Sequence, residues 1–111
     1  MNKNVLSLIS LATKAGKTVT GEFSVESAVK DNKAVLVVVS ADSSDRSKKM
    51  YKNMCEFYRV PLYFFGTKDE LGHFTGKEFR ASVAILDNGF KKSIVSALEL
   101  LGSEEYSHGG N

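Results

Sequence analysis

The chain has very few of the residues from which small proteins build disulfide scaffolds or thiolate metal sites. Only one of its 111 residues, Cys55, is a cysteine. A lone cysteine excludes an internal disulfide and a thiolate zinc cluster, and it is typical of a protein kept in a reducing cytoplasm. No apolar run approaches the about 20 residues that a membrane-spanning helix needs. We therefore expect a cytoplasmic protein with no membrane segment.

The chain also has little excess of charge of one sign over the other. The composition, 42% hydrophobic and 25% charged, is ordinary for a soluble globular protein, and the net charge is +2. The last nine residues contain Glu104 and Glu105 but no lysine or arginine, so residues 1–102 carry 15 positive and 11 negative charges. This mildly basic balance permits a nucleic-acid partner without requiring one.

Motifs for nucleotide hydrolysis, metal binding and nucleophilic catalysis are incomplete. Gly16-Lys17-Thr18 resembles the end of a phosphate-binding P-loop, but Leu11 occupies the position of the first glycine, and the tripeptide follows a predicted helix instead of a strand. His73 has no second histidine or cysteine nearby, so its better reading is a surface residue. Cys55 is better explained by packing than by nucleophilic chemistry. The sequence predicts no enzyme, no cofactor and no metal site.

Helical and strand periodicities alternate along the chain. The apolar run at 34–39 is typical of a central strand covered on both faces, and Thr67 with Glu70 has the spacing of a capping box. On the third helix Met50, Met54 and either Phe57 or Tyr58 are expected to face inward. The predicted order is helix 4–15, strand 18–20, helix from 21, strand 34–39, a helix capped by Ser43 or Ser44 that ends at the break at 60–61, strand 62–65, helix 68–74, strand 81–86 and a last helix that follows Asp87 or Asn88 and reaches 101.

This alternation predicts an α/β fold: a three-layer α/β/α sandwich with a small central sheet of about four strands and helices on both faces. Residues 1–102 form the single expected domain. Residues 103–111 show no apolar periodicity, so we expect a disordered tail.

One corner has the chemistry to bind an anionic polymer. If Thr20 caps the second helix, the amides of residues 21–23 point outward at the positive end of the helix dipole, and Gly21 allows a close backbone approach. Lys14 and Lys17 are close in sequence and are expected to flank this corner. The competing interpretation is an ordinary capped helix with two solvated lysines.

Several motifs follow one another in an order that is informative as a whole: Lys14-Ala15-Gly16-Lys17, Gly21-Glu22, the run 34–39 with Asp42 beyond it, Val60-Pro61, Glu70-Leu71-Gly72 and 81–87. Together they resemble the ribosomal protein L7Ae superfamily, and most of all its small bacterial YlxQ-like members, over nearly the whole predicted domain. The resemblance implies an α/β/α sandwich that binds structured RNA, typically a kink-turn with sheared G·A pairs. In family members the start of the second helix enters the widened groove, and the loop before the last strand covers an extruded nucleotide.

The chain departs from the family where the bases are read. Kink-turn binders carry Gly-x-Asn-Glu-x-x-Lys, whereas the matching positions here are Gly21, Phe23, Ser24 and Ser27. The missing side chains remove base-edge contacts of about 1–3 kcal/mol each if the same RNA is bound. Phe23 has the chemistry to stack on a base, with burial in the core as its other reading.

A second group of candidates matches the loop before the last strand. Arg80 is expected to pair with a phosphate, and Phe79 either caps an unstacked base or packs under the loop.

The prediction is a non-enzymatic, monomeric RNA-binding protein, ribosome-associated, without a membrane partner or a small-molecule substrate. The alternatives are a protein-interaction module that kept the fold and lost RNA, and an enzyme that uses a cleft at the sheet edge for a small molecule. The expected RNA-contacting residues are Lys14, Lys17, Gly21, Glu22, Phe23, Ser24, Ser27, Phe79 and Arg80.

Overall fold

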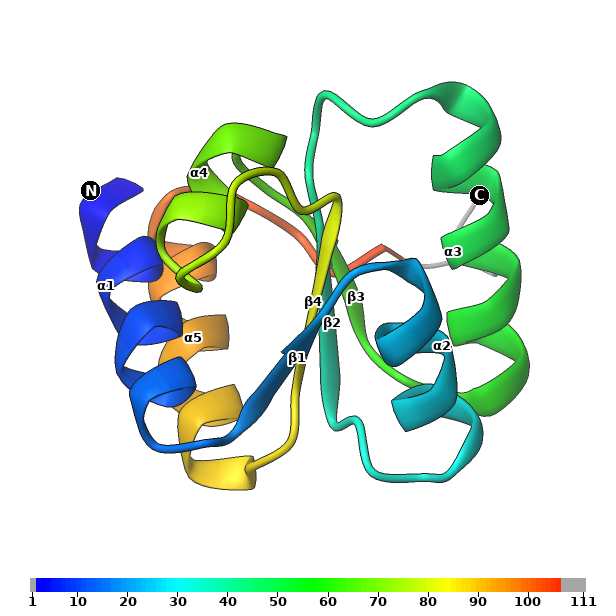
Figure 1. Cartoon of the computed structure of the whole chain (residues 1–111), viewed down its shortest axis with the longest axis horizontal. Coiled ribbons are helices and arrows are strands. Elements are labelled where there is room, and N and C mark those ends of the chain that lie inside the picture. The colour runs from blue at the N-terminus through cyan, green and yellow to red at the C-terminus, as the bar shows by residue number, and fades with distance from the viewer. Residues whose placement is uncertain (1, 107–111) are drawn as a thin grey trace.

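The computed structural model describes residues 2–106, and the side chains of residues 4–106. Figure 1 shows a central sheet with helices on both faces, as predicted. In chain order the elements are α1 (Asn2–Lys14), β1 (Thr18–Thr20), α2 (Glu22–Lys30), β2 (Leu36–Val39), α3 (Asp45–Tyr58), β3 (Leu62–Phe64), α4 (Lys68–His73), β4 (Ser82–Ile85) and α5 (Asn88–Leu100).

The sheet has four strands in the order β1-β4-β2-β3. β4 runs antiparallel to both of its neighbours, and β2 and β3 are parallel. Every residue of β2 and β4 is buried, which confirms the central place predicted for the apolar run. β1 and β3 therefore form the two edges.

Each face of the sheet has its own core. Leu36 and Val38 point to the side covered by α1, α4 and α5, and Val37 and Val39 point to the side covered by α2 and α3. Because successive side chains of a strand alternate between faces, a strand covered on both sides must be apolar throughout. The α/β/α sandwich is thus confirmed. Within residues 2–106 no helix combines the length and the apolarity that crossing a bilayer requires.

The inner face of α3 differs in part from the prediction. Tyr51 and Cys55, four residues apart, are its buried residues and were not predicted. Met50, Met54 and Tyr58 are partly buried and pack against the same core, which agrees with the predicted inner face and with Tyr58 as its aromatic residue. Phe57 is 77% exposed, because a helix that buries Tyr51 and Cys55 turns position 57 outward. Burial raises the pKa of the Cys55 thiol to about 12, so this cysteine is a packing residue and a poor nucleophile at neutral pH.

The start of the expected disordered tail packs on the fold. The Tyr106 N–H donates to the Leu62 carbonyl at 2.8 Å, and the Tyr106 ring meets that of Phe64 edge-on at 6.3 Å between centroids. No sequence pattern signals this contact, because one aromatic ring and one backbone hydrogen bond to an edge strand need no apolar periodicity. Residues 107–111 lie outside the described part of the chain.

The loop between α4 and β4 lies directly against α4, whose predicted capping box of Thr67 and Glu70 is present. A Cβ on Gly72 would stand 2.2 Å from the Glu78 carbonyl oxygen and 3.0 Å from the Phe79 Cα. Only glycine allows this approach, and the approach fixes the path of the chain toward Phe79 and Arg80.

We predict that Gly72→Ala lowers the free energy of unfolding by about 1–3 kcal/mol, because the added methyl group must displace backbone. Urea denaturation followed by circular dichroism measures the change. Ser96→Ala, at an exposed position of α5, is the control and should leave stability within about 0.5 kcal/mol. Equal stability of Gly72→Ala and wild type would contradict the packing described here.

Candidate functional site

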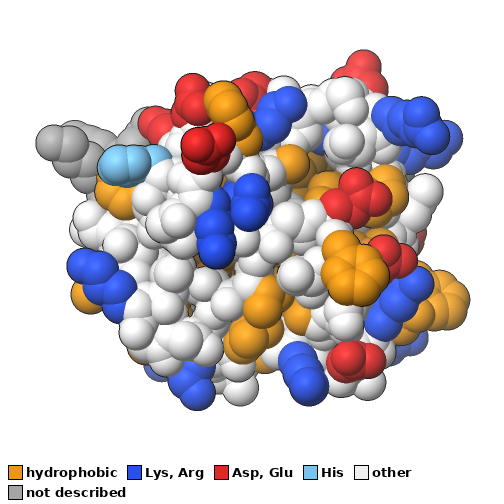
Figure 2. All heavy atoms as spheres, viewed as in Figure 1, with side chains coloured by type: hydrophobic (Ala, Val, Ile, Leu, Met, Phe, Trp, Pro, Cys, Tyr) orange, Lys and Arg blue, Asp and Glu red, His pale blue; other side chains and the backbone are white. Residues whose placement is uncertain are grey.

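A polar groove of about 440 Å³ lies between the end of α1, strand β1, the start of α2 and the α4–β4 loop. In Figure 2 blue lysine and arginine side chains stand in the middle of this face, over the α4–β4 loop, beside a pale surface without charge. The groove is therefore cationic and rich in hydroxyls. Its lining residues are Thr13, Thr18, Val19, Thr20, Ser24, Thr75, Lys77 and Arg80.

Arg80 joins the two segments that were predicted as separate sites. Its Nε donates to Thr20 Oγ1 at 3.1 Å, and its guanidinium also donates to the Phe79 carbonyl at 2.7 Å. Its Cδ and Nε come within 3.8 Å of where a Cβ on Gly21 would stand. A guanidinium has five N–H donors, so Arg80 keeps donors for an anionic ligand at the mouth of α2.

The Thr20 cap that was predicted for α2 is wrong. Thr20 ends β1, paired with Val83, and its hydroxyl accepts from Arg80. Gly21 takes the N-cap position with φ 90° and without a side-chain cap. A positive φ of this kind favours glycine. The backbone conformation therefore explains why glycine stands at position 21 better than the predicted close approach to a ligand does.

In the described part of the chain, the amides left unbonded at the start of α2 are those of residues 22–24, whereas the sequence predicted residues 21–23. The Gly21 N–H is used, because it donates to the Ser82 carbonyl at 3.1 Å, and Ser82 is itself fixed by a buried hydroxyl bond to Tyr51 at 2.7 Å. The N–H groups of Glu22, Phe23 and Ser24 have no acceptor within residues 2–106. They form the positive end of the α2 dipole, although the Glu22 carboxylate in the same turn offsets part of that potential.

Both candidate aromatics are on the surface. Phe23 is 84% exposed and Phe79 is 63% exposed, so the alternative readings that placed them in the core or under the loop are wrong. Ser24 lines the polar groove, and Ser27 lines a neighbouring hollow of about 320 Å³ together with Phe23. Phe23, Ser24 and Ser27, which occupy the family's base-reading positions, thus line one surface of α2, and the Phe23 ring on it is exposed.

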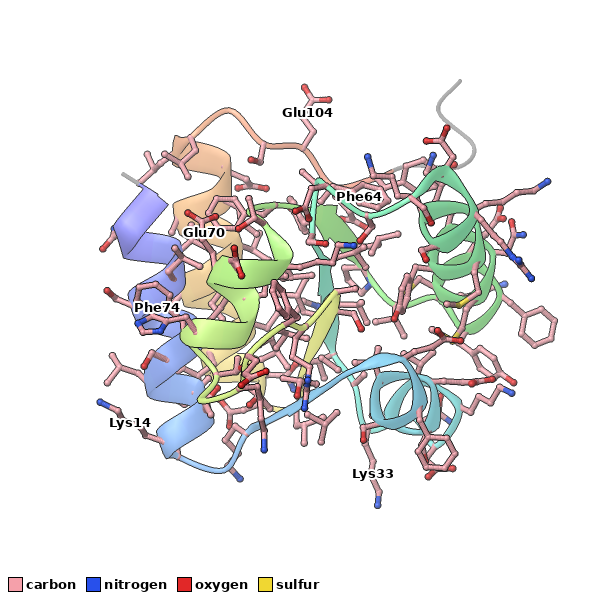
Figure 3. All side chains as sticks on the ribbon, turned by 45° about the horizontal axis from the view of Figure 1, so that its top comes forward. Lys14, Lys33, Phe64, Glu70, Phe74 and Glu104 are labelled. Carbon is pink, nitrogen blue, oxygen red and sulfur yellow. The ribbon has the colours of Figure 1, made fainter. Side chains whose placement is uncertain are left out.

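Lys14 and Lys17 lie apart from this corner. Lys14 ends α1, at some distance from α2 in Figure 3, and Lys17 precedes β1, whereas Gly21 follows it. A three-residue strand separates Lys17 from Gly21 by roughly 10 Å or more, and neither lysine lines the groove. The prediction that they flank Gly21 is wrong, because closeness in sequence is not closeness in space across an extended segment.

Sequence reasoning missed part of the groove. Thr18 and Thr20 occupy alternate positions of a strand, so the strand prediction already placed them on one face. Lys77 stands in the same glycine-flanked basic segment as Arg80 and was available as a candidate. Thr13, whose hydroxyl lies 2.9 Å from that of Thr18, and Thr75 gave no local signal, because tertiary packing brings them there.

The comparison with protein families decides the classification. The model of the ribosomal protein L7Ae/L30e/S12e/Gadd45 family matches residues 3–95. The chain belongs to this family. Among its relatives, the "RNA-binding protein YlxQ" of Bacillus subtilis is 35% identical over 92 residues, which cover 83% of this chain and 92% of the relative. The protein of the same name from Enterococcus faecium is 34% identical, over 87% of this chain and 93% of the relative.

Solved structures share the fold of this chain. A Bacillus halodurans protein of unknown function superposes with a TM-score of 0.81 at 32% identity, over 86% of this chain and 96% of its own. The Giardia lamblia 15.5kD RNA-binding protein, at 20% identity, has a TM-score of 0.73 over 89% of this chain and 85% of its own, and it supports the fold alone. The predicted resemblance to a bacterial YlxQ-like member is confirmed.

We predict that Thr20→Val releases Arg80 without disturbing the strand, because valine keeps the β-branched shape and removes only the acceptor. The Arg80 Nε–H resonance, which the hydrogen bond should protect from solvent exchange, should exchange several-fold faster in an NMR measurement. Thr18→Val, which removes a groove hydroxyl that does not contact Arg80, is the matched control. Unchanged exchange in Thr20→Val would show that the hydrogen bond is absent in solution.

Proposed function

We propose that this protein is a non-enzymatic RNA-binding protein, which binds bent or looped structured RNA, of ribosomal origin, through the start of α2 and the α4–β4 loop. The observation that carries the proposal is the position of Arg80. It bonds to Thr20 and lies against Gly21, so that one cation serves both segments of the surface. Recognition is then by shape and backbone first.

The groups on this surface match the parts of an RNA strand. Arg80, Lys77 and the amides of residues 22–24 suit phosphate oxygens. The hydroxyls along β1 suit 2′-hydroxyl groups, which donate and accept. Phe23 and Phe79 offer exposed rings on which unpaired bases stack, a contact worth roughly 1–3 kcal/mol per base.

The names of the relatives support the same conclusion. Both YlxQ proteins are called RNA-binding, and they align over most of their length. A large ribosomal subunit protein, eL8 of Thermoplasma volcanium, is 32% identical over 91% of this chain and 88% of its own. We therefore propose that this chain binds RNA and that the RNA is ribosomal.

We predict that Arg80→Ala and Lys77→Ala each weaken RNA binding and reduce the slope of log affinity against log salt by about 0.7–0.9, since each removes one phosphate contact. A labelled RNA hairpin with a kink-turn, titrated at several salt concentrations, measures both effects. Lys92→Ala, an exposed lysine of α5, is the control and should bind as wild type. Lys14→Ala and Lys17→Ala should have smaller effects because neither side chain lines the groove.

Two outcomes would contradict this proposal. Wild-type affinity in both groove variants would remove the RNA site from this surface. No salt-dependent RNA binding by the wild-type protein would favour a protein-interaction module that kept the fold and lost RNA.

We further predict weak selectivity for the sheared G·A pairs of a kink-turn. Phe23, Ser24 and Ser27 cannot supply the carboxylate, amide and cation of the family motif, so altering those pairs should cost the wild-type protein less than about tenfold in affinity. Phe23→Asn, Ser24→Glu and Ser27→Lys combined should sharpen the discrimination. Discrimination above about 100-fold by the wild type would show that other groups read the bases.

A further inference from the structure

The hollow of about 320 Å³ that adjoins the polar groove differs from it in chemistry. Its apolar lining is formed by Val19, Ala28 and Leu86, which belong to the core on the α2 and α3 side of the sheet or pack against it. The groove and the hollow share Val19 and Ser24, so they are neighbours on the surface. An RNA strand that lies in the groove can therefore place an adjacent nucleotide in the hollow.

Three exposed side chains of different chemistry stand around this apolar lining. Phe23 offers a ring that is 84% exposed, Asp31 offers a carboxylate and Lys33 offers an ammonium group. Figure 3 shows the Lys33 side chain beside α2, directed away from the body of the protein. The volume is at the lower end of the roughly 300–1,000 Å³ of small-molecule sites, which suits a single ring system. An aromatic ring, an apolar floor, an acceptor and a cation are together the groups that hold one unpaired nucleotide.

Backbone hydrogen bonds fix the segment that carries the two charges. The Asp31 N–H donates to the Ser27 carbonyl at 3.0 Å, and the Lys33 N–H donates to the Ala28 carbonyl at 2.9 Å. Between them Asn32 has a φ of 60°, so the chain turns sharply at the end of α2. The two charged side chains therefore start from a defined backbone, as a preformed site requires.

Asp31 stands where a carboxylate does not help the protein to fold. It is the C-cap residue of α2, at the negative end of the helix dipole, where a cation is the favourable charge. Within residues 2–106 its carboxylate has no ion-pair or hydrogen-bond partner, whereas Glu26 on the same helix pairs with Lys30 at 2.7 Å. A charge that opposes the helix dipole and has no partner in the fold is available for a ligand.

The carboxylate selects the kind of base. It accepts hydrogen bonds and donates none, so it is best matched by two adjacent N–H donors. Guanine has this pair on its Watson–Crick edge, the ring N–H and the 2-amino group, whereas adenine, cytosine and uracil each have one donor group there. We propose that the hollow binds an unpaired guanine of the RNA, which stacks on Phe23 and donates to Asp31 while its phosphate contacts Lys33. This inference rests on the proposed RNA-binding function.

Short single-stranded RNAs test the choice of base. The probes are fluorescein-labelled UUUUU, UUGUU, UUAUU, UUCUU and an analogue of UUGUU with inosine in place of guanosine, and anisotropy gives the affinity of the wild-type protein at several salt concentrations. UUGUU should bind about tenfold more tightly than the other natural sequences, because a bidentate contact to a base edge discriminates by that order. The inosine probe, which lacks the 2-amino group, should lose about threefold.

Two variants separate base reading from phosphate contact. Asp31→Asn should bring the affinities for UUGUU and UUAUU within about twofold of each other and leave that for UUUUU equal or slightly higher, because it removes an acceptor and a negative charge. Lys33→Gln should weaken all five probes by a similar factor and reduce the salt slope by about 0.7. Asp69→Asn makes the same change as Asp31→Asn at an exposed position of α4 and, as the matched control, should keep the preference for guanine.

The melting temperature distinguishes a binding role of Asp31 from a structural one. Asp31→Asn should melt at the wild-type temperature or above it, because it removes a negative charge from the end of α2. A clear fall in the melting temperature would make the carboxylate a structural residue and would overturn its assignment to a ligand.

Three binding results would also overturn the proposal. The first is that UUGUU does not bind, or binds no more tightly than UUAUU. The second is a guanine preference that survives in Asp31→Asn. The third is free GMP that binds as tightly as UUGUU, which would assign the hollow to a free nucleotide. Failure of the groove proposal is recognised separately, by wild-type affinity for the kink-turn hairpin in the Lys77→Ala and Arg80→Ala proteins.

Discussion

The antiparallel pairing of β1 with β4 determines where the binding surface lies. Its register sets Thr20 opposite Val83 and lets the Gly21 amide donate to the Ser82 carbonyl. The start of α2 and the end of the α4–β4 loop, sixty residues apart in sequence, are therefore neighbours. The Arg80 bond to Thr20 follows from this pairing, since a shift of one residue would turn the Thr20 hydroxyl to the other face of the sheet.

Burial on both sides of the sheet explains why the polar groove lies at the start of α2 and the α4–β4 loop. All side chains of β2 are apolar, and the one polar side chain of β4, Ser82, forms a hydrogen bond with the buried Tyr51 hydroxyl. Cys55, in the same core as Tyr51, has its pKa raised by burial and stays a thiol. The chemistry left for function is that of edges, loops and helix starts, where backbone amides and cations meet solvent.

The sequence was a good guide to the elements and a weaker guide to their contacts. Periodicity located the strands and the buried run at 34–39, because a strand covered on both faces leaves a continuous apolar signal. Thr20 was predicted as an N-cap on its intrinsic preference, but in the fold it belongs to β1 and its hydroxyl accepts from Arg80. The contact of Tyr106 with β3 was missed because a single docked ring leaves no periodic pattern.

The candidate site shows the same limit. Resemblance to the family located Gly21, Phe23, Phe79 and Arg80, which do lie around the start of α2. Closeness in sequence was the argument for Lys14 and Lys17, and neither of them lines the groove. Thr13 and Thr75 enter the groove through contacts between distant elements, and local sequence patterns do not encode such contacts.

Ultraviolet crosslinking of the protein to its cellular RNA, followed by mass spectrometry of the linked peptides, tests the central claim that the start of α2 and the α4–β4 loop form one RNA-binding surface. We predict crosslinks to Phe23 and Phe79 on the same RNA fragments, because both rings are exposed and Arg80 holds their segments together. Crosslinks confined to other elements, with neither ring modified, would contradict it.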